Sequence, residues 1–155
     1  MTGAVFVDLL AAYDTVNHRR MLDKLYKMIK DLHLSRFIQT MLENRQFMVV
    51  LDNKERRWRK QCNGLPQGSV LAPILFKTYT NDQPLTDRTE MFVYADDLCT
   101  TSHAKDFAEV ETALTVALDA LIPYYSENHL HANPTKTKTC VFHLRNREAQ
   151  RTLNI

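Results

Sequence analysis

The chain has 155 residues, of which 45% are hydrophobic and 25% are charged, and its formal net charge is +2. Those values are typical of one globular domain with a sizeable core. No apolar run approaches the roughly 20 residues that span a bilayer. The start of the chain also lacks the basic and long apolar segments of a signal peptide. We therefore expect an intracellular protein, nuclear or cytoplasmic rather than secreted, with no membrane partner.

The first half of the chain predicts a strand, two helices and a hairpin. The apolar run Ala4–Leu9 indicates a buried strand. Apolar residues at helical spacing predict one helix over His18–Leu32 and a second over Arg36–Glu43, capped by Ser35. Two strand-like segments, Phe47–Leu51 and Trp58–Cys62, are joined around residues 52–54 and predict a β-hairpin.

A glycine-flanked loop follows. Gly64 and Gly68 are two of the chain's three glycines, and they enclose Leu65-Pro66-Gln67. Glycine is useful where the backbone bends sharply or approaches a ligand closely. We expect Gly68 or Ser69 to open a helix that runs to Tyr79, with Pro73 tolerated in its first turn. The amide groups of such a helix start are natural partners of anions.

The second half predicts another hairpin, a helix and a last strand. The apolar runs Met91–Tyr94 and Leu98–Ser102 flank Asp96-Asp97, and Asp106–Leu121 is an amphipathic helix that Pro123 should kink or restart. Thr139–Leu144 reads as a closing strand. This order predicts an α+β fold, in which an antiparallel sheet is backed by helices on one face in a split βαβ arrangement.

Three carboxylates end predicted strands. Asp96 and Asp97 are adjacent at the tip of the second hairpin, and Asp8 ends the first strand. Adjacent carboxylates repel each other, so we expect a cation between them, with Mg²⁺ or Mn²⁺ as the hard-oxygen choice. The alternative is an ordinary turn, which tolerates Asp-Asp well. Paired divalent ions held by aspartates are a general device for displacement at phosphorus.

The basic and sulfur-containing residues narrow the chemistry further. Basic clusters at Lys54–Lys60, Lys136/Lys138 and Arg145–Arg151 predict either a surface that follows phosphates or simply solvated faces. The cysteines form no CxxC pair, which disfavours a disulfide framework. A zinc set at His129, His131, Cys140 and His143 is disfavoured, because positions three apart on a strand point to opposite faces.

Four segments in order carry a resemblance to a known family. Phe6–Val16, Gly64–Pro73 and Tyr94–Asp97 resemble palm motifs A, B and C of reverse transcriptases, and Asn133–Lys138 resembles motif D. The hairpin-containing insertion at residues 17–62, between motifs A and B, is similar to that of non-LTR (LINE-type) retrotransposon enzymes of the Jockey-like kind. The resemblance covers nearly the whole chain as far as Phe142.

The resemblance implies an RNA-directed DNA polymerase, a nucleotidyltransferase that adds dNTPs to a primer 3′-hydroxyl on an RNA template. It implies that Asp8 and Asp96 are the principal ligands of two Mg²⁺ ions, with Asp97 as the third carboxylate and Mn²⁺ able to substitute. Lys136 then becomes a candidate proton donor to the leaving pyrophosphate. The plain alternative for Lys136 is an ordinary surface lysine.

Three further residues acquire expected roles from the resemblance. Tyr13 lies where the family places an aromatic steric gate against the sugar 2′-hydroxyl, and its alternative is a core aromatic. Gln67 and Gly68 would contact the incoming nucleotide and the template, and they also suit a tight turn before a helix. Asp14 is expected to be structural rather than a metal ligand.

The departures from the family pattern set the domain expectation. We expect residues 1–144 to be a partial palm domain without upstream fingers or thumb, followed by an undetermined tail at residues 145–155. Such a palm should expose apolar surface and self-associate. A second hypothesis is therefore a catalytically inactive relic or nucleic-acid-binding module with the same fold. A third is a group II intron or retron polymerase, which the insertion disfavours.

Overall fold

The computed structural model describes residues 1–143 and 152–155 and divides the chain into two compact units. We call them the sheet unit, residues 1–12 and 82–155, and the helical unit, residues 13–81. A four-residue helix, α1 (Ala12–Thr15), begins at the boundary. The expected basic cluster Arg145–Arg151 and the last residue of the predicted closing strand, Leu144, lie outside the described residues.

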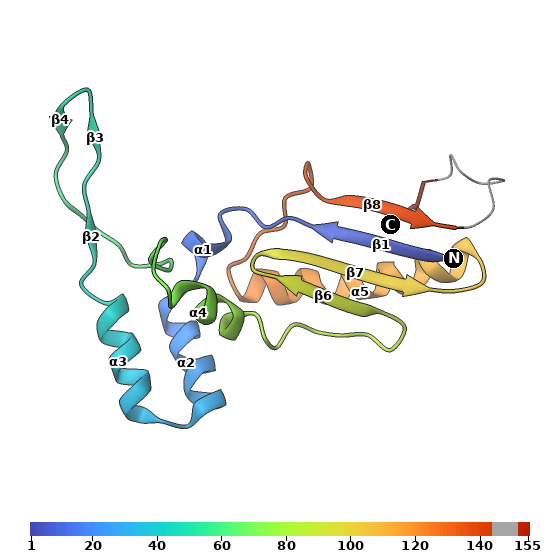
Figure 1. Cartoon of the computed structure of the whole chain (residues 1–155), viewed down its shortest axis with the longest axis horizontal. Helices are drawn as coiled ribbons and strands as arrows, with labels where there is room; N and C mark the ends of the chain where they lie inside the picture. The colour runs from blue at the N-terminus through green and yellow to red at the C-terminus, as the bar shows by residue number, and fades with distance from the viewer. Residues whose placement is uncertain (144–151) are drawn as a thin grey trace. The chain divides into compact units, whose positions relative to one another are not determined.

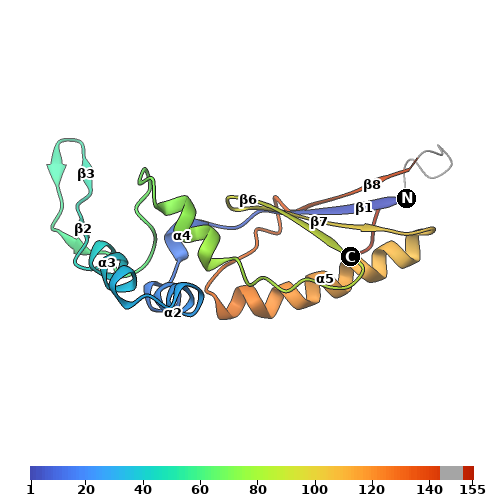
Figure 2. The same ribbon diagram turned by 60° about the horizontal axis from the view of Figure 1, so that its bottom comes forward.

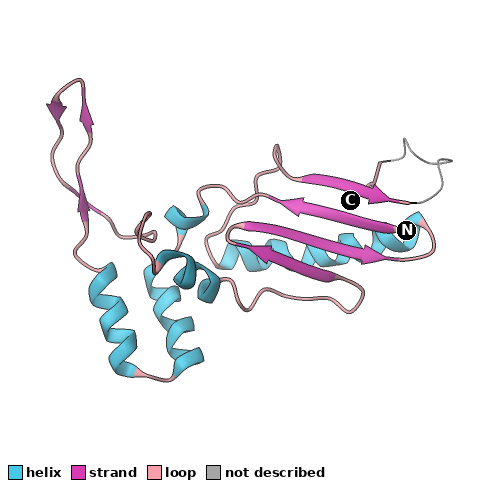
Figure 3. Ribbon diagram, viewed as in Figure 1, coloured by secondary structure: helices cyan, strands magenta, loops and turns pink. Residues whose placement is uncertain are grey.

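The sheet unit contains a four-stranded antiparallel sheet in the order β6-β7-β1-β8 (Figures 1 and 3). Its strands are β1 (Thr2–Val7), β6 (Glu90–Tyr94), β7 (Asp97–His103) and β8 (Lys138–Phe142). Strands β7 and β8 both run antiparallel to β1, which lies between them. The connection from β7 to β8 is the helix α5 (Phe107–Glu127). This is the expected split βαβ arrangement, and the α+β prediction is confirmed.

Helix α5 covers one face of this sheet, as Figure 2 shows. The covered face explains the alternating burial along β7, where Leu98, Thr100 and Ser102 are buried and their neighbours are not. The core between the helix and the sheet is mainly aliphatic and includes Val5, Val7, Leu98, Val110, Leu114 and Leu121. The opposite face leaves the large side chains of Phe6, Phe92 and Phe142 exposed.

Helix α5 continues past Pro123 to Glu127, so the predicted restart at this proline is wrong, whereas the predicted kink stays a prediction. A proline inside a helix removes one backbone hydrogen bond. Leu121 and Tyr125, on either side of it, are both buried, and burial of two large side chains offsets that loss. The helix begins at the predicted place, because the Asp106 carboxylate accepts a hydrogen bond from the amide of Glu109.

The helical unit contains three longer helices and a narrow ribbon of paired strands (Figure 1). The helices are α2 (His18–Ile29), α3 (Leu32–Leu42) and α4 (Ala72–Tyr79). The short strands are β2 (Gln46–Phe47), β3 (Val50–Leu51), β4 (Lys54–Glu55) and β5 (Arg59–Lys60). Helix α2 packs against both α3 and α4. The core of this unit includes Met21, Leu25, Leu42, Leu65, Phe76 and Tyr79.

Two helix starts differ from the prediction. Helix α3 is capped by Asp31, whose carboxylate accepts from the amides of His33 and Leu34, and not by Ser35. The Ser35 hydroxyl instead donates to the Asp31 carbonyl inside the first turn. Helix α4 begins at Ala72, later than the predicted Gly68 or Ser69, because residues 66–71 form turns first. Pro73 is in its first turn, as predicted.

Candidate active site

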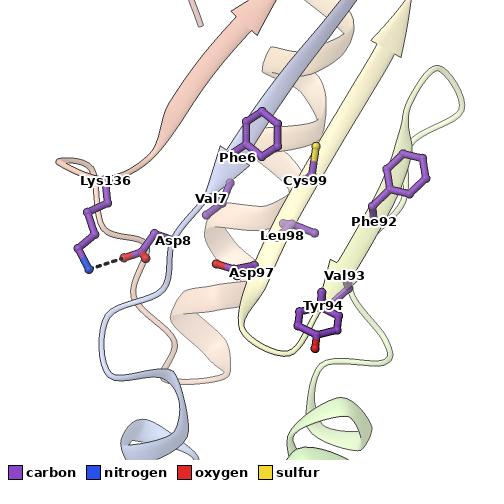
Figure 4. Close-up of a pocket in the computed structure, with 10 residues that line it drawn as sticks. All are labelled: Phe6, Val7, Asp8, Phe92, Val93, Tyr94, Asp97, Leu98, Cys99 and Lys136. Carbon is purple, nitrogen blue, oxygen red and sulfur yellow. Dashed lines mark ion pairs between the residues drawn. The ribbon is translucent and has the colours of Figure 1, made fainter.

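The register of the central strands brings Asp8 and Asp97 together. Val7, the last residue of β1, pairs with Leu98 on β7, so Asp8 and Asp97 are the next residues on either side of that pair. Both line one pocket of about 480 Å³ in the sheet unit, and Lys136 lines it too. Figure 4 shows the Asp97 carboxylate directed towards the β1 side of the pocket, where Asp8 lies. The structure thus gathers three of the four predicted catalytic side chains.

Asp8 is held at both its main chain and its side chain by one residue. The backbone amide of Asn133 donates to the Asp8 carbonyl at 2.7 Å, and its side-chain Nδ2 donates to Asp8 Oδ2 at 3.1 Å. Asn133 is buried. Its own Oδ1 accepts from the amide and the hydroxyl of Thr135. The turn at Asn133 therefore fixes where the Asp8 carboxylate points.

Lys136 is the cation beside Asp8. Its Nζ lies 3.8 Å from Asp8 Oδ2, drawn as a dashed line in Figure 4. The lysine side chain is 69% exposed and that of Asp8 is 31% exposed, so water screens this ion pair and its contribution to stability is small. In Figure 4 the ammonium lies on the side of the Asp8 carboxylate away from Asp97.

Asp96 lies apart from this group. It follows Ala95, whose φ of 53° makes the tight turn between β6 and β7, and it is half-buried. Asp96 is not among the residues that line the pocket. Across the described ranges 1–143 and 152–155, no group of three His, Cys, Asp or Glu side chains is placed to hold a metal ion. The structure therefore brings two of the three predicted metal ligands to one pocket.

The rest of the pocket wall is largely apolar. It includes Phe6 on β1 and Phe92 and Tyr94 on β6 (Figure 4). Cys99, on β7, lies between Phe6 and Phe92 and pairs with both. Burial raises the pKa of the Cys99 thiol, and the nearby Cys140 raises it further. A thiol that stays protonated is a poor nucleophile and a poor metal ligand. Cys99 is therefore a wall residue, and the acidic end of the pocket carries the charge.

The other predicted site residues belong to the helical unit. Tyr13 stacks on Phe76 with ring centroids 4.7 Å apart, and it is half-buried. Gln67 donates from Nε2 to Asp14 Oδ1 at 2.9 Å, which gives Asp14 the structural contact expected of it. Gly68 has a φ of +82° and open space where a Cβ would lie. Three predicted residues thus occupy or border the loop before α4.

A magnesium ion suits the oxygen donors at the acidic end of the pocket. Mg²⁺ usually binds proteins through one or two carboxylates and completes its shell with water and substrate phosphates. Asp8 and Asp97 supply two such carboxylates on neighbouring strand ends. The ammonium of Lys136 lies beside the Asp8 carboxylate, at 3.8 Å. The donor set therefore fits the hard divalent cation that the sequence suggested.

Asn133 is the site residue whose role the sequence did not reveal. Its contacts to Asp8 join positions 125 residues apart, and no local pattern reports such a distance. A weak signal existed, because Asn-Pro-Thr is typical of a turn in which the asparagine side chain accepts from the backbone two residues later. The structure contains that hydrogen bond, from the amide of Thr135.

Within the described residues, no helix is both long and apolar enough to cross a membrane. The three cysteines are free thiols, as the absence of CxxC spacing suggested. His143 approaches Phe107 edge to face.

Comparison with solved structures supports the fold. The chain superposes on an apo telomerase from Candida tropicalis, truncated of its C-terminal domain, with a TM-score of 0.66 and 13% identity. The match covers 90% of this chain and 30% of the telomerase chain. A second apo telomerase structure from the same organism gives a TM-score of 0.68 at 11% identity. At identities this low, the similarity shows a shared fold and nothing more.

Comparison with protein sequences reaches further. The chain is 31% identical over 151 residues to a probable RNA-directed DNA polymerase from transposon BS of Drosophila melanogaster, covering 92% of this chain and 17% of that protein. It is 27% identical over 145 residues to the RNA-directed DNA polymerase from the mobile element jockey of the same fly, covering 88% and 16%. The chain therefore spans only a small part of the relatives that it matches.

The family described as reverse transcriptase (RNA-dependent DNA polymerase) matches residues 1–153, nearly the whole chain. The match includes every segment that resembles a palm motif, and the relatives are polymerases of non-LTR elements such as jockey. The sheet with its split βαβ connection and the carboxylates at its strand ends agree with that assignment. The chain belongs to the reverse transcriptase family.

Proposed function

We propose that this chain forms the catalytic palm of an RNA-directed DNA polymerase, which adds dNTPs to a primer 3′-hydroxyl on an RNA template. The observation that carries the proposal is the meeting of Asp8 and Asp97 at one end of a single pocket. Their carboxylates would hold Mg²⁺, with Mn²⁺ able to substitute. Two such ions, when bound, supply activation of the attacking hydroxyl and neutralisation of the phosphate charge.

The residues around the carboxylates would orient the metal ligands and neutralise the charge that develops on the leaving group. Asn133 orients Asp8 through the hydrogen bond to Oδ2. Lys136, within 3.8 Å of the same oxygen, is suited to donate a proton to the departing pyrophosphate. Asp96, predicted as a principal ligand together with Asp8, lies one residue before Asp97 in the β6–β7 turn and would complete the set of carboxylates. Phosphoryl transfer needs such positioning and charge neutralisation more than it needs a protein nucleophile.

The helical unit would supply nucleotide selection. The Tyr13 ring, braced by its stacking on Phe76, would exclude a sugar 2′-hydroxyl and so favour dNTPs over ribonucleotides. Gln67 and Gly68 would contact the incoming nucleotide and the template. The open space above Gly68 lets a ligand approach the backbone closely.

Primer extension with Mn²⁺ on a poly(rA)/oligo(dT) template tests this proposal. We expect Asp8→Asn, Asp96→Asn and Asp97→Asn to abolish extension, whereas Asp87→Asn, at an exposed aspartate of the same unit, should leave it intact. Mn²⁺ binding followed by electron paramagnetic resonance gives an independent readout, and Asp8→Asn should weaken it. Extension or binding that survives Asp8→Asn would remove the metal-dependent account.

A second candidate function is a catalytically inactive module that binds nucleic acid. The observation that favours it is the absence, across the described residues, of a group of three metal-binding side chains. Under this candidate the chain binds template and primer but shows no extension, and all three aspartate substitutions leave its nucleic-acid affinity unchanged.

Self-association through exposed palm surface stays a prediction. The sheet face opposite α5 exposes three large apolar side chains: Phe6 on β1, Phe92 on β6 and Phe142 on β8. Sedimentation of the wild-type chain and of Phe92→Ser at matched concentrations measures it. A monomeric wild-type chain at high concentration contradicts the prediction.

A further inference from the structure

The helical unit carries a two-stranded ribbon, residues 45–60, that concentrates positive charge. It contains six basic and two acidic side chains, whereas the net charge of the whole chain is only +2. Within the described residues, the side chains of Lys54 and Arg56 to Lys60 enter no ion pair. The basic residues are Arg45, Lys54, Arg56, Arg57, Arg59 and Lys60.

The ribbon consists of two pairings that do not share one register. Strand β2 pairs with β5 through Phe47 and Arg59, and β3 pairs with β4 through Val50 and Glu55. Two residues, 48–49, therefore stand opposite three, 56–58, and the returning strand carries an extra residue. A β-bulge of this kind bends a strand and redirects its side chains. The bulged segment is Arg56-Arg57-Trp58.

The turn at the tip of the ribbon is formed by Asp52 and Asn53, both in the left-handed conformation, with φ of 50° and 57°. Two consecutive left-handed residues give the turn type that matches the twist of paired strands. The hairpin itself was predicted, and this turn places its centre at the predicted residues 52–54. The ribbon is thus a regular hairpin whose irregularity is confined to the arginine-tryptophan segment.

Within the part of the chain that the structure describes, the tip and the returning strand of the ribbon are uncovered. Every side chain from Leu51 to Lys60 is exposed, Trp58 by 62%. A two-stranded ribbon alone is marginally stable, and tryptophan is costly to leave in water. A partner that covers Trp58 and neutralises the arginines would stabilise both. A polyanion with flat apolar faces offers both properties, and nucleic acid has that chemistry: phosphates for the arginines and bases that stack on an aromatic ring.

We propose that the ribbon binds single-stranded nucleic acid, with phosphates on the bulged arginines and an unpaired base stacked on Trp58. An indole ring stacks on a base only where the base is free of a duplex, so the geometry favours a single strand over a double helix. The inference rests on the proposed function in that the chain handles a nucleic-acid substrate. Binding at the ribbon, however, requires neither Asp8 nor metal.

The single tryptophan of the chain makes the test local. Titration of the intact chain with an unlabelled twelve-nucleotide oligouridine should quench Trp58 fluorescence and saturate. Affinity should fall with salt, by a slope of about 0.7 for each phosphate neutralised. Arg56→Ala/Arg57→Ala should therefore flatten the slope by about 1.4. Trp58→Ala, followed by anisotropy of a labelled strand, should weaken binding about tenfold.

The matched control is Arg19→Ala/Arg20→Ala, which removes another adjacent pair of exposed arginines from the same unit. It should leave the salt slope and the quenching unchanged. Equal losses from the two arginine pairs, an absence of quenching, or equal quenching by a fully paired duplex would each overturn the inference. Asp8→Asn should leave quenching intact, so loss of extension with retained quenching contradicts neither this inference nor the proposed polymerase.

Discussion

Asn133 contacts Asp8 twice, from its backbone amide at 2.7 Å and from its side-chain Nδ2 at 3.1 Å. The first contact fixes the chain path just beyond β1, and the second fixes the carboxylate. A hydrogen bond from a neutral donor leaves the carboxylate its charge and its remaining lone pairs for a cation. Asn133 therefore ties the motif D segment to the carboxylate of motif A by hydrogen bonds, beside the ion pair that Lys136 makes with the same carboxylate.

Replacing Asn133 with alanine should weaken metal binding. Partners that orient a metal ligand typically contribute about 10- to 100-fold in affinity. We expect Asn133→Ala to reduce Mn²⁺ affinity by that amount, measured by electron paramagnetic resonance at a temperature where circular dichroism shows the variant folded.

The matched control for that experiment is Asn128→Ala. Asn128 is also buried, lies in the same unit, and donates from Nδ2 to the Tyr124 carbonyl at 2.8 Å. It should lower stability without changing Mn²⁺ affinity. If both substitutions change the affinity alike, Asn133 acts through folding and not through Asp8.

Removing the Lys136 charge should slow primer extension but leave the free energy of unfolding nearly unchanged. The pair with Asp8 is largely solvated, so Lys136→Met should change the unfolding free energy by less than about 1 kcal/mol. A proton donor to the leaving group contributes about 10²-fold or more, so single-turnover extension should slow by that factor. Lys138→Met, at an exposed lysine on β8, is the control. Equal rates for the two variants would make Lys136 an ordinary surface lysine.

Short-range sequence patterns predicted most of the helices and strands. The apolar runs predicted β1, β6 and β7, and the amphipathic spacing predicted α2 and most of α5. These elements are decided by which side chains face the core, and periodicity reports that directly. The order of the elements predicted the antiparallel sheet and its split βαβ arrangement, and the structure adds that β7 and β8 lie on either side of β1.

The predictions failed where two nearby residues could play the same part, or where a contact joins distant segments. Asp31 and Ser35 are both good cap residues, and the choice fell to Asp31 because Lys30, with a φ of 56°, turns the chain at that point. A left-handed lysine has no sequence signature. Pro123 was overridden by the burial of its neighbours. The contact between Asn133 and Asp8 depends on the sheet register, which no single segment encodes.

The loop before α4 offers a test with two glycines of similar φ. A Cβ added to Gly64, whose φ is +86°, would lie 2.9 Å from the Asp14 carbonyl oxygen, whereas one on Gly68, whose φ is +82°, meets nothing within 4 Å. Gly68→Ala should cost about 1 kcal/mol for its left-handed backbone alone. Gly64→Ala should cost about 3 kcal/mol, since the clash is with backbone that cannot rotate away. Equal urea midpoints for the two variants would contradict the close approach of Gly64 to Asp14.

The thiols should react with a polar alkylating reagent in an order set by their surroundings. Burial raises the pKa of Cys99 and of Cys140, so the reactive thiolate of each is scarce at neutral pH, and both side chains are half-buried. Cys62 is exposed. Iodoacetamide at pH 7.5 should therefore label Cys62 first, as peptide mass spectrometry would show, and labelling of Cys99 should accelerate as the pH rises above 9. Cys99 lines the pocket together with Asp8 and Asp97. Early modification of Cys99 at neutral pH would mean that its side chain is more exposed to solvent than the structure shows.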